Sequence, residues 1–489
     1  MATSANSGPR RDLNARRDIP PNSPLSCEGL RATALSLSHL TWSIGTSTTV
    51  RTCHQTTSFP VYWQNSSQAT WVQVPLQRPI ELCMVLAEKL SFSADLDERF
   101  FLELPAGAAV FVFRGEGEPY VSKTANLRKR LQRLLGPPAE QSKRLNLRDR
   151  VREIEFTMTG SDFESQFLLY RMQREMFPKT YAARLRLRPA PLVKFHLEND
   201  YPRASVTTKL TKLPAMHTAG AGERAPSKTN LYYGPFPSRA AAEKFASAAL
   251  DFFKMRRCVD DLHPDPAFPG CVYSEMKMCL APCFKGCTDN EYRQEVLRVQ
   301  NFFDTQGQSL VRELSDERDR ASNALAFEDA AAIHARLDKL KPLLAQLPEI
   351  VGRVDQLKAL IIQPGVPLEG AAVSQSVSLF LFNACTLMGP VQFSVAPVAE
   401  SRSMESRLEE AIATFSRANA TMGEHSEHLA ILKRWHYRST RTGEIFIADA
   451  NGQWPMRRMV RGISRVAQGE KPQEASPTFS ASPASPSPS

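Results

Sequence analysis

Five cysteines crowd into one short stretch of the chain, and the spacing of four of them suits metal binding. These four follow the pattern C-x12-C-x7-C-x3-C and are Cys258, Cys271, Cys279 and Cys283. Thiolates at such separations suit a tetrahedral Zn(II) ion or a four-cysteine iron–sulfur cluster, because the last two can chelate across one turn while the others arrive from loops. The alternative is that four reduced cysteines pack as small apolar groups. Cys287 has no place in the pattern, and we treat it as a bystander.

A second group of candidate residues lies in a basic stretch. From Tyr120 to Arg150 the chain carries nine Lys or Arg residues against two acidic ones. This balance suits contacts with phosphate groups, whose affinity falls as the salt concentration rises. The candidates for such contacts are Lys123, Arg128, Lys129, Arg130 and Arg133. The alternative interpretation is a tyrosine at the edge of a core, followed by a solvated basic helix.

The elements that must position these residues follow from the apolar periodicity. Around the basic stretch, the sequence predicts a helix over 78–90, two strands joined by a turn over 108–122, a basic helix over 124–135, a strand over 154–160 and a helix over 161–177. The last helix opens at Ser161, with Glu164 in the spacing of a capping box.

Strands and helices continue along the rest of the chain. The expected strands lie over 190–198, 204–210, 230–236, 357–364, 377–385, 391–397 and 443–449. The expected helices lie over 238–253, 289–343, 404–418 and 424–437. His425, His428 and His436 fall on the last of these helices, beside Trp435, and we expect them on its surface rather than at a metal.

Length and composition divide these elements among several modules. A chain of 489 residues is too long for one ordinary core. We expect a disordered or spurious N-terminal extension over 1–77, a small α/β domain over 78–188, an α+β connector over 189–255, a cysteine-rich region over 256–290, a helical segment over 291–345, a second small α+β domain over 346–452 and a low-complexity tail over 453–489. The fold class is therefore α+β.

The charge balance sets only broad limits on function. The chain carries 61 Lys and Arg against 51 Asp and Glu, a formal charge of +10, which favours approach to polyanions but identifies no partner alone. No apolar run approaches the roughly 20 residues needed to cross a bilayer, and the polar start of the chain lacks the apolar core of a secretory signal. We expect a cytoplasmic protein without a membrane partner.

The segment LPAGAAVFVFRGEGEPYVSKTANLRKRL resembles the first half of a GIY-YIG endonuclease domain. The similar variant is the one at the front of the C subunit of the bacterial UvrABC excinuclease. That resemblance implies hydrolysis of a phosphodiester by a tyrosine near a lysine and an arginine, with a glutamate holding a divalent metal, Mg or Mn. It assigns Tyr120, Lys123 and Arg130 to the catalytic set.

Three positions depart from the pattern of that family. Phe111 stands where its first tyrosine is expected, Ser122 where a glycine is expected, and Leu169 where the metal-binding glutamate is expected. A leucine cannot bind a metal ion. Glu164 and Glu175 lie about 140° and about 120° away around the helix and so point elsewhere. The resemblance therefore implies an impaired nuclease site that can still contact DNA.

Two further segments resemble the same subunit. The cysteine stretch contains CLAPC and follows NLYYGPFPS, both similar to that protein's cysteine region. The segment LSDERDRASNALAFEDAAAIHARLDKLKPL resembles the UVR motif, a helical hairpin through which the C subunit meets the B subunit. This resemblance implies a partner site made by Leu325, Phe327, Glu328, Ala331 and Arg336, with Leu337 as a further apolar anchor. The alternative is an ordinary amphipathic hairpin packed within this protein.

The C-terminal strands lack the residues of a second nuclease. The strands expected over 357–364, 377–385 and 391–397 carry no Asp or Glu, so they offer no metal site of the kind with which the full subunit continues. We regard this unit as a degenerate or unrelated α+β domain.

Three functions stay open from the sequence. The leading hypothesis is an excinuclease-C-like protein of nucleotide excision repair that binds DNA and a B-subunit-like partner through an impaired nuclease unit. The first alternative is an active, metal-dependent single-incision endonuclease. The second is a scaffold that neither cuts nor binds DNA.

Overall fold

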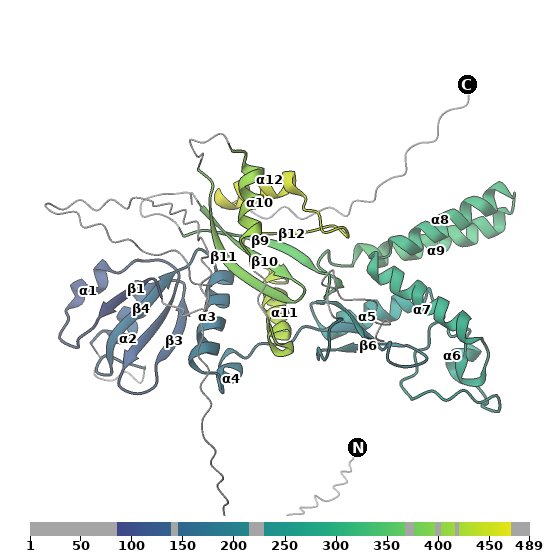
Figure 1. Ribbon diagram of the computed structural model, residues 1–489, viewed down its shortest axis with the longest axis horizontal. Coiled ribbons are helices and arrows are strands. Elements are labelled where there is room, and N and C mark those ends of the chain that lie inside the picture. The colour runs from purple at the N-terminus through teal and green to yellow at the C-terminus, as the bar shows by residue number, and fades with distance from the viewer. Residues whose placement is uncertain are drawn as a thin grey trace, which may run out of the picture. The chain divides into compact units, whose positions relative to one another are not determined.

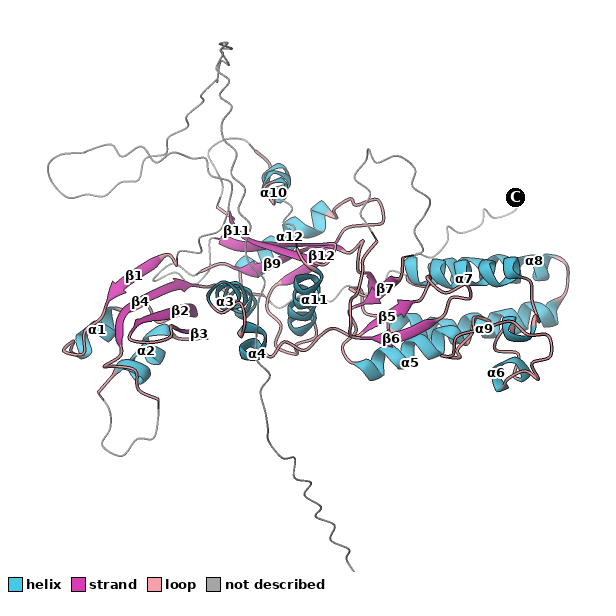
Figure 2. Ribbon diagram, turned by 60° about the horizontal axis from the view of Figure 1, so that its bottom comes forward, coloured by secondary structure: helices cyan, strands magenta, loops and turns pink. Residues whose placement is uncertain are grey.

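The computed structural model describes residues 86–137, 145–214, 229–366, 376–396, 402–415 and 420–470. The described residues all belong to the unit 80–489, and residues 1–79 lie outside the described part. The N-terminal extension expected over 1–77 therefore lies outside it as well. The helices and strands of this unit are drawn in Figures 1 and 2.

The first sheet has four antiparallel strands in the order β1-β4-β2-β3. The strands are β1 (Glu88–Ser91), β2 (Ala109–Gly115), β3 (Tyr120–Thr124) and β4 (Val151–Met158). One face packs against α1 (Glu98–Glu103) and α2 (Leu127–Leu135), and the other packs against α3 (Asp162–Met176). The expected hairpin, basic helix, third strand and following helix are confirmed at these places.

The start of this unit differs from the expectation. A helix was expected over 78–90, but Glu88–Ser91 form the edge strand β1, and residues 78–85 lie outside the described part. Leu90 lies opposite Ile154 of β4, so the segment is held by pairing with a neighbouring strand. Such tertiary pairing overrides the weak local preference of a short segment for helix.

The second sheet has the order β6-β5-β7-β8 and carries a group of helices. Its strands are β5 (Leu192–Phe195), β6 (Ala204–Thr207), β7 (Leu231–Gly234) and β8 (Gly352–Arg353). The helices of this region are α4 (Tyr181–Leu185), α5 (Arg239–Leu250), α6 (Val272–Glu275), a 3₁₀ turn at Pro282–Phe284, α7 (Asp289–Asp304), α8 (Gln308–Asn323) and α9 (Phe327–Ala345).

The single helical stretch expected over 289–343 is three helices. Gly307 separates α7 from α8 with a φ of +89°, and a Cβ there would lie 2.2 Å from Leu344, so only glycine fits this turn. Leu325 separates α8 from α9, also with a positive φ of 58°. Helices α8 and α9 then run side by side as a hairpin (Figure 1).

The third sheet has the order β11-β10-β9-β12. Its strands are β9 (Lys358–Pro364), β10 (Ser376–Asn383), β11 (Thr386–Ser394) and β12 (Glu444–Ile447). One face packs against α11 (Met422–His436), and the other packs against α10 (Met404–Ala413) and α12 (Met456–Ala467).

Helix α12 corrects the boundary of the expected C-terminal tail. The segment 453–489 was assigned to a low-complexity tail, yet Met459 and Ile463 of α12 are completely buried against the third sheet. Apolar residues at helical spacing form one face of this arginine-rich segment, and that periodicity was overlooked. Residues 471–489 lie outside the described part.

Helix α3 belongs to two cores. Its Met172 packs with Val112 and Val121 of the first sheet. On another side, the Phe163 ring lies 5.0 Å from that of Phe380 on β10 and 5.2 Å from that of Trp435 on α11. Helix α3 therefore packs against both the first sheet and the third.

Among the described residues, no helix is both long enough and apolar enough to cross a membrane.

Candidate nucleic-acid interface

Tyr120 and Arg130 form a pair on one face of the first sheet. The Tyr120 ring packs against Phe111 and Phe113, with ring centres 6.1 and 5.7 Å away, because these three side chains share a face of β2 and β3. Arg130, on the overlying helix α2, donates a hydrogen bond from Nη2 to the Tyr120 hydroxyl oxygen over 3.1 Å. The structure thus brings together two of the three residues assigned to the catalytic set.

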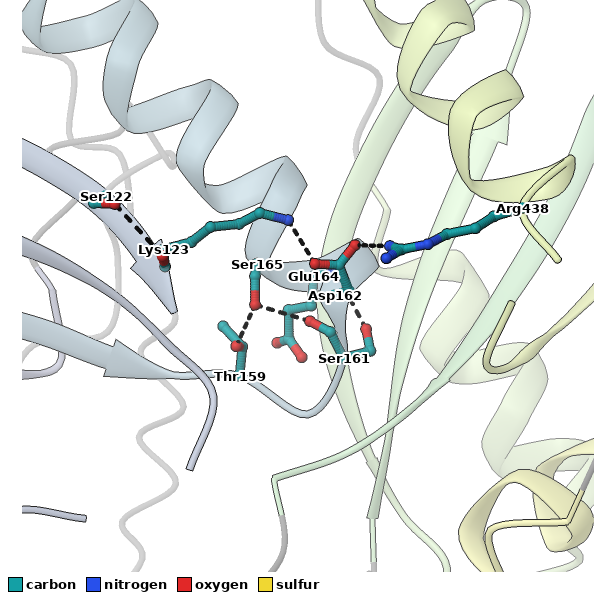
Figure 3. Close-up of polar contacts among 8 residues, drawn as sticks. All are labelled: Ser122, Lys123, Thr159, Ser161, Asp162, Glu164, Ser165 and Arg438. Carbon is teal, nitrogen blue, oxygen red and sulfur yellow. Dashed lines mark hydrogen bonds and ion pairs between the residues drawn. The ribbon is translucent and has the colours of Figure 1, made fainter. Parts of the chain in front are cut away.

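Lys123 lies on the opposite face. Successive side chains of a strand point to opposite faces, so residues three apart on β3 diverge. Lys123 pairs across the sheet with Val110, on the α3 side, and its Nζ donates to Asp162 Oδ1 over 2.6 Å at the start of α3. Arg438, which follows α11, binds the second oxygen of the same carboxylate (Figure 3).

Burial and charge both act on Lys123. Burial lowers the pKa of Lys123 from its usual value, and the like charges of Arg434 and Arg438 lower it further, while Asp162 opposes both effects. Asp162 is placed well for its charge, since acidic groups are favoured in the first turn of a helix. Burial has the largest single effect on the pKa of Asp162 and raises it. The charges and hydrogen bonds of Lys123 and Arg438 together outweigh burial, so the pKa of Asp162 lies below its ordinary value.

The other basic candidates of α2 differ in their availability. Lys129 and Arg133 are exposed, and their side chains make no hydrogen bond or ion pair with described residues. Arg128 donates from Nε to the Leu104 carbonyl oxygen over 2.7 Å, which satisfies one donor without neutralising its charge. Helix α2 therefore presents cationic side chains to solvent that no described carboxylate compensates.

The three departures from the GIY-YIG pattern fit their surroundings as apolar or small residues. The Phe111 ring is completely buried in the core beneath α2. Ser122, half-buried opposite Phe111, donates only a long bond of 3.4 Å to the Lys123 carbonyl oxygen. Leu169 packs beside Val121 and Met172 in the apolar cluster between α3 and the sheet, where a carboxylate would be costly.

The neighbouring carboxylate does not replace the missing ligand. Glu164 is buried, and it accepts bonds from the Gly160 N–H over 2.9 Å and the Ser378 hydroxyl over 3.3 Å, on the side of the third sheet. Burial raises the pKa of Glu164. Only half of the expected capping box forms: Ser161 accepts from the Glu164 N–H, but Glu164 caps Gly160 instead of Ser161.

The four cysteines of the predicted metal site lie near one another. Burial chiefly raises the pKa of the Cys279 thiol to about 11, and negative charge on Cys258, Cys283 or Cys271 raises it further, although a bond from the Ala281 N–H opposes the shift. Cys287 is half-buried, and the charge of Cys283 also contributes to raising its pKa after burial and two nearby carboxylates.

A buried arginine beside the cysteines suits a thiolate centre. Arg256 is only 2% exposed, and its guanidinium donates to the carbonyl oxygens of Tyr201 and Asp260 and, over 3.4 Å, to Cys258 Sγ. None of these partners is a carboxylate, and a buried cation needs an opposite charge nearby. Metal-bound thiolates would supply that charge, so the donor chemistry fits. As placed, however, no three His, Cys, Asp or Glu side chains of the described residues converge on one metal position.

The five residues of the predicted partner site are all exposed at the hairpin. Leu325 and Phe327, two residues apart where α9 begins, are 73% and 64% exposed. Glu328, Ala331 and Arg336 are also exposed along α9. Leu337 was expected among the anchors but is 3% exposed, because it faces the protein core with Ile333 and Leu340.

The histidines of α11 are not surface residues throughout, as had been expected. His428 is 7% exposed, and its Nδ1 accepts a bond from the Leu387 N–H over 3.2 Å. Burial lowers the pKa of His428 to about 3. His425 and His436 are half-buried. The face of α11 that carries His428 packs on the third sheet, which local periodicity did not reveal.

Sequence reasoning missed Asp162, Arg434 and Arg438 as companions of Lys123. The two arginines are four residues apart, so a helix would place them on one side, but nothing local links that side to β3. Only the packing of α3 between the two sheets brings them together.

Comparisons with known proteins identify relatives of part of the chain. Residues 201–302 match the family described as UvrC/Cho excinuclease, middle domain. The UvrABC system protein C of Idiomarina loihiensis is 28% identical over 222 residues, which is 45% of this chain and 34% of that protein. The proteins of the same name from Carboxydothermus hydrogenoformans and Coxiella burnetii are each 26% identical, over 50% and 52% of this chain and 38% and 39% of their own lengths.

These matches show that the chain is similar to the C proteins of UvrABC systems. The matched region spans well under half the length of these relatives. No solved structure matches the chain.

Proposed function

We propose that this protein is an excinuclease-C-like component of nucleotide excision repair that binds DNA and a B-subunit-like partner, and that its GIY-YIG site is impaired. The observation that carries the proposal is the match of residues 201–302 to the excinuclease middle domain. The similarity to UvrABC system protein C extends over about half of the chain and supports the same role.

DNA binding is supported by the exposed cations of α2. Lys129 and Arg133 have no described counter-charge, so they can approach a phosphate backbone without first breaking an ion pair. Binding of a labelled duplex, measured by fluorescence anisotropy over a series of salt concentrations, tests this role. Each lost phosphate contact should lower the slope of log affinity against log salt by about 1.

Replacing Lys129 and Arg133 by Gln should therefore weaken binding and flatten the salt dependence. The exposed Arg312 of α8, whose side chain makes no hydrogen bond or ion pair with described residues, serves as the control position. A wild-type protein without salt-dependent binding would favour the scaffold alternative.

The impaired nuclease is supported by two of the departures from the GIY-YIG pattern. Leu169, at the position expected for the metal-binding glutamate, lies in an apolar cluster, and Phe111 places a buried ring without a hydroxyl where a tyrosine is expected. In a nicking assay on a lesion-bearing duplex with Mg or Mn, the protein should leave the duplex uncut. The active-endonuclease alternative is favoured by the intact Tyr120–Arg130 bond, and metal-dependent cuts that disappear in Tyr120→Phe would establish it.

Partner binding is supported by the hairpin tip. Leu325 is exposed and also holds a positive φ of 58°, a conformation that costs a side chain about 1 kcal/mol or more. A residue that is both strained and exposed contributes little to the free energy of folding, which fits a role in binding a partner. Co-purification with the B subunit of the host, before and after replacement of Phe327 by Ser, tests the interaction.

We propose further that Cys258, Cys271, Cys279 and Cys283 hold a Zn(II) ion or an iron–sulfur cluster. A bound centre would cross-link loops that have little regular structure of their own. Iron and zinc analysis of protein purified without oxygen distinguishes the two. Protein that contains neither metal would overturn the assignment.

A further inference from the structure

A small basic cavity lies between α3 and the end of α11. Its volume is about 30 Å³, and it is lined by Asp162 and Phe163 from the first turn of α3, by Arg434 and Trp435 of α11, and by Arg438 and Arg441 just beyond it. Trp435 is almost completely buried, and the Arg441 guanidinium lies 5.4 Å from the centre of its ring. The cavity is therefore lined by a buried aromatic ring and by arginine side chains.

The charges at this cavity are unbalanced. Lys123 reaches the Asp162 carboxylate from β3, Arg438 binds the same carboxylate, and Arg434 lines the same cavity as Asp162. Arg434 is exposed and forms no hydrogen bond or ion pair with any described residue. Glu164, another acid in the first turn of α3, is buried on the side of Ser378. The positive charge of Arg434 is therefore left without a counter-charge among the described residues.

The position of Asp162 indicates what this cavity accepts. Lys123 and Arg438 approach its carboxylate from opposite sides, one oxygen each (Figure 3). The Asp162 side chain is 53% exposed, so it can turn outward without unfolding the helix. An external anion with several oxygens would find the same donors and, in addition, Arg434.

We propose that this cavity is a phosphate site, in which a phosphate group takes the place of the Asp162 carboxylate between Lys123 and Arg438 and gains Arg434 as a third cation. Arginine suits this role because its planar guanidinium can donate two parallel bonds to phosphate oxygens. Lysine contributes as a point charge. Asp162 is then an internal competitor that occupies the site when no phosphate is present.

The phosphate can belong to a nucleic-acid backbone or to a small phosphate ion or ester. The first source rests on the DNA binding proposed above, and the second does not. Both have the same chemistry at the cavity, so the experiment needs a duplex arm and an inorganic phosphate arm.

Two substitutions with opposite expected effects test the site. Arg434→Gln removes a cation that has no described partner, so the fold should be unaffected. It should weaken duplex binding by about 3- to 10-fold and lower the salt slope by about 1. Asp162→Asn removes the competing carboxylate and should tighten duplex binding by a similar factor. Arg312→Gln, on α8 and away from the cavity, should leave the affinity unchanged.

The second arm uses inorganic phosphate at constant ionic strength. Phosphate should raise the melting temperature of the wild-type protein, and Arg434→Gln should abolish the rise, since the ligand stabilises only the form that binds it. This arm reports on the cavity even if the protein binds no duplex, in which case the DNA-binding role fails and the phosphate site stands.

The outcomes separate the two sources. If Arg434→Gln weakens duplex binding and also abolishes the rise in melting temperature with phosphate, the cavity binds a backbone phosphate. If it abolishes only the rise in melting temperature, the cavity binds a small phosphate. Duplex binding that is indifferent to Arg434→Gln and Asp162→Asn, together with a melting temperature indifferent to phosphate, overturns the proposed site and leaves DNA binding through α2 intact.

Discussion

Tyr120 and Lys123, three residues apart on β3, send their side chains to opposite faces of the first sheet. Tyr120 meets Arg130 of α2, whereas Lys123 meets Asp162 of α3. On the Lys123 face, apolar residues such as Val112 and Val121 pack against α3. The two groups therefore work in separate surroundings, although the GIY-YIG resemblance assigns them to one reaction.

This separation predicts that their contributions to stability are additive. Tyr120→Phe should cost about 0.5–1.5 kcal/mol by removing the bond from Arg130. When Tyr120→Phe and Lys123→Met are combined, the change in the free energy of unfolding should equal the sum of the single changes within about 0.5 kcal/mol. Urea denaturation of the four proteins measures this. A coupling well above that value would mean that the two side chains share one environment.

The buried histidine of α11 predicts sensitivity to acid. Burial lowers the pKa of His428 to about 3, and the neighbouring His425, Arg174 and Arg171 act in the same direction. In the unfolded chain its pKa is about 6.5, so below that pH the unfolded state binds the proton more readily. Stability should fall as the pH drops from about 6.5 toward 3, and should be unaffected by this group above pH 7.

His428→Gln keeps an acceptor for the Leu387 N–H but cannot be protonated in this range. Its unfolding free energy should fall less steeply with acid than that of the wild type. The slope should not vanish, because burial also lowers the pKa values of His196 and His436 to about 4. An identical slope in the two proteins between pH 6.5 and 4 would contradict the assignment to His428.

At the hairpin tip, stability and partner binding should be separable. Leu325→Gly relieves a positive φ of 58° and removes an exposed side chain. It should leave the protein equally stable, or more stable by up to about 1 kcal/mol, yet reduce capture of the B-subunit-like partner. Leu337→Ala serves as the matched control, since its side chain is buried: about 2–5 kcal/mol of stability should be lost. Full capture by Leu325→Gly would exclude the tip as the contact.

Arg256 should govern metal retention at the cysteines. Its buried guanidinium contacts Cys258 Sγ and no carboxylate. Arg256→Gln removes the positive charge that balances a thiolate centre, so the iron or zinc content per chain should drop several-fold, while Arg256→Lys should retain part of it. Elemental analysis measures the content. Arg257→Gln, whose side chain pairs with Asp251 instead, is the control.

The elements around the candidate site could be predicted because their residues carry regular patterns. A continuous apolar run marked β2, the turn after it marked the start of β3, and Ser161 marked the start of α3. Strand β1 could not be recognised, since its conformation depends on Ile154 in β4. Local sequence patterns also did not reveal which residues are buried. His428 and Leu337 resemble surface residues until the elements that cover them are known.

At the candidate sites, too, features of single segments could be predicted, whereas contacts between distant segments could not. The exposure of Leu325 and Phe327 agrees with a role that needs access from solvent. The contact of Lys123 with a carboxylate shared by Arg438 joins segments far apart in the chain, and no spacing rule could have suggested it. It depends on where α3 lies between two sheets.

Because α3 contributes to two cores, we expect that the first sheet and its helices do not fold independently of the third sheet. A fragment cut after residue 188 would bare Phe163, Phe167 and Tyr170, whose partners include Phe380 and Trp435 on distant elements. Such a fragment would expose an aromatic stripe and tend to self-associate. Any change that loosens the third sheet would then disturb α3 and, through it, the first sheet, so mutations near residue 380 can alter the basic surface around Lys123 without touching it.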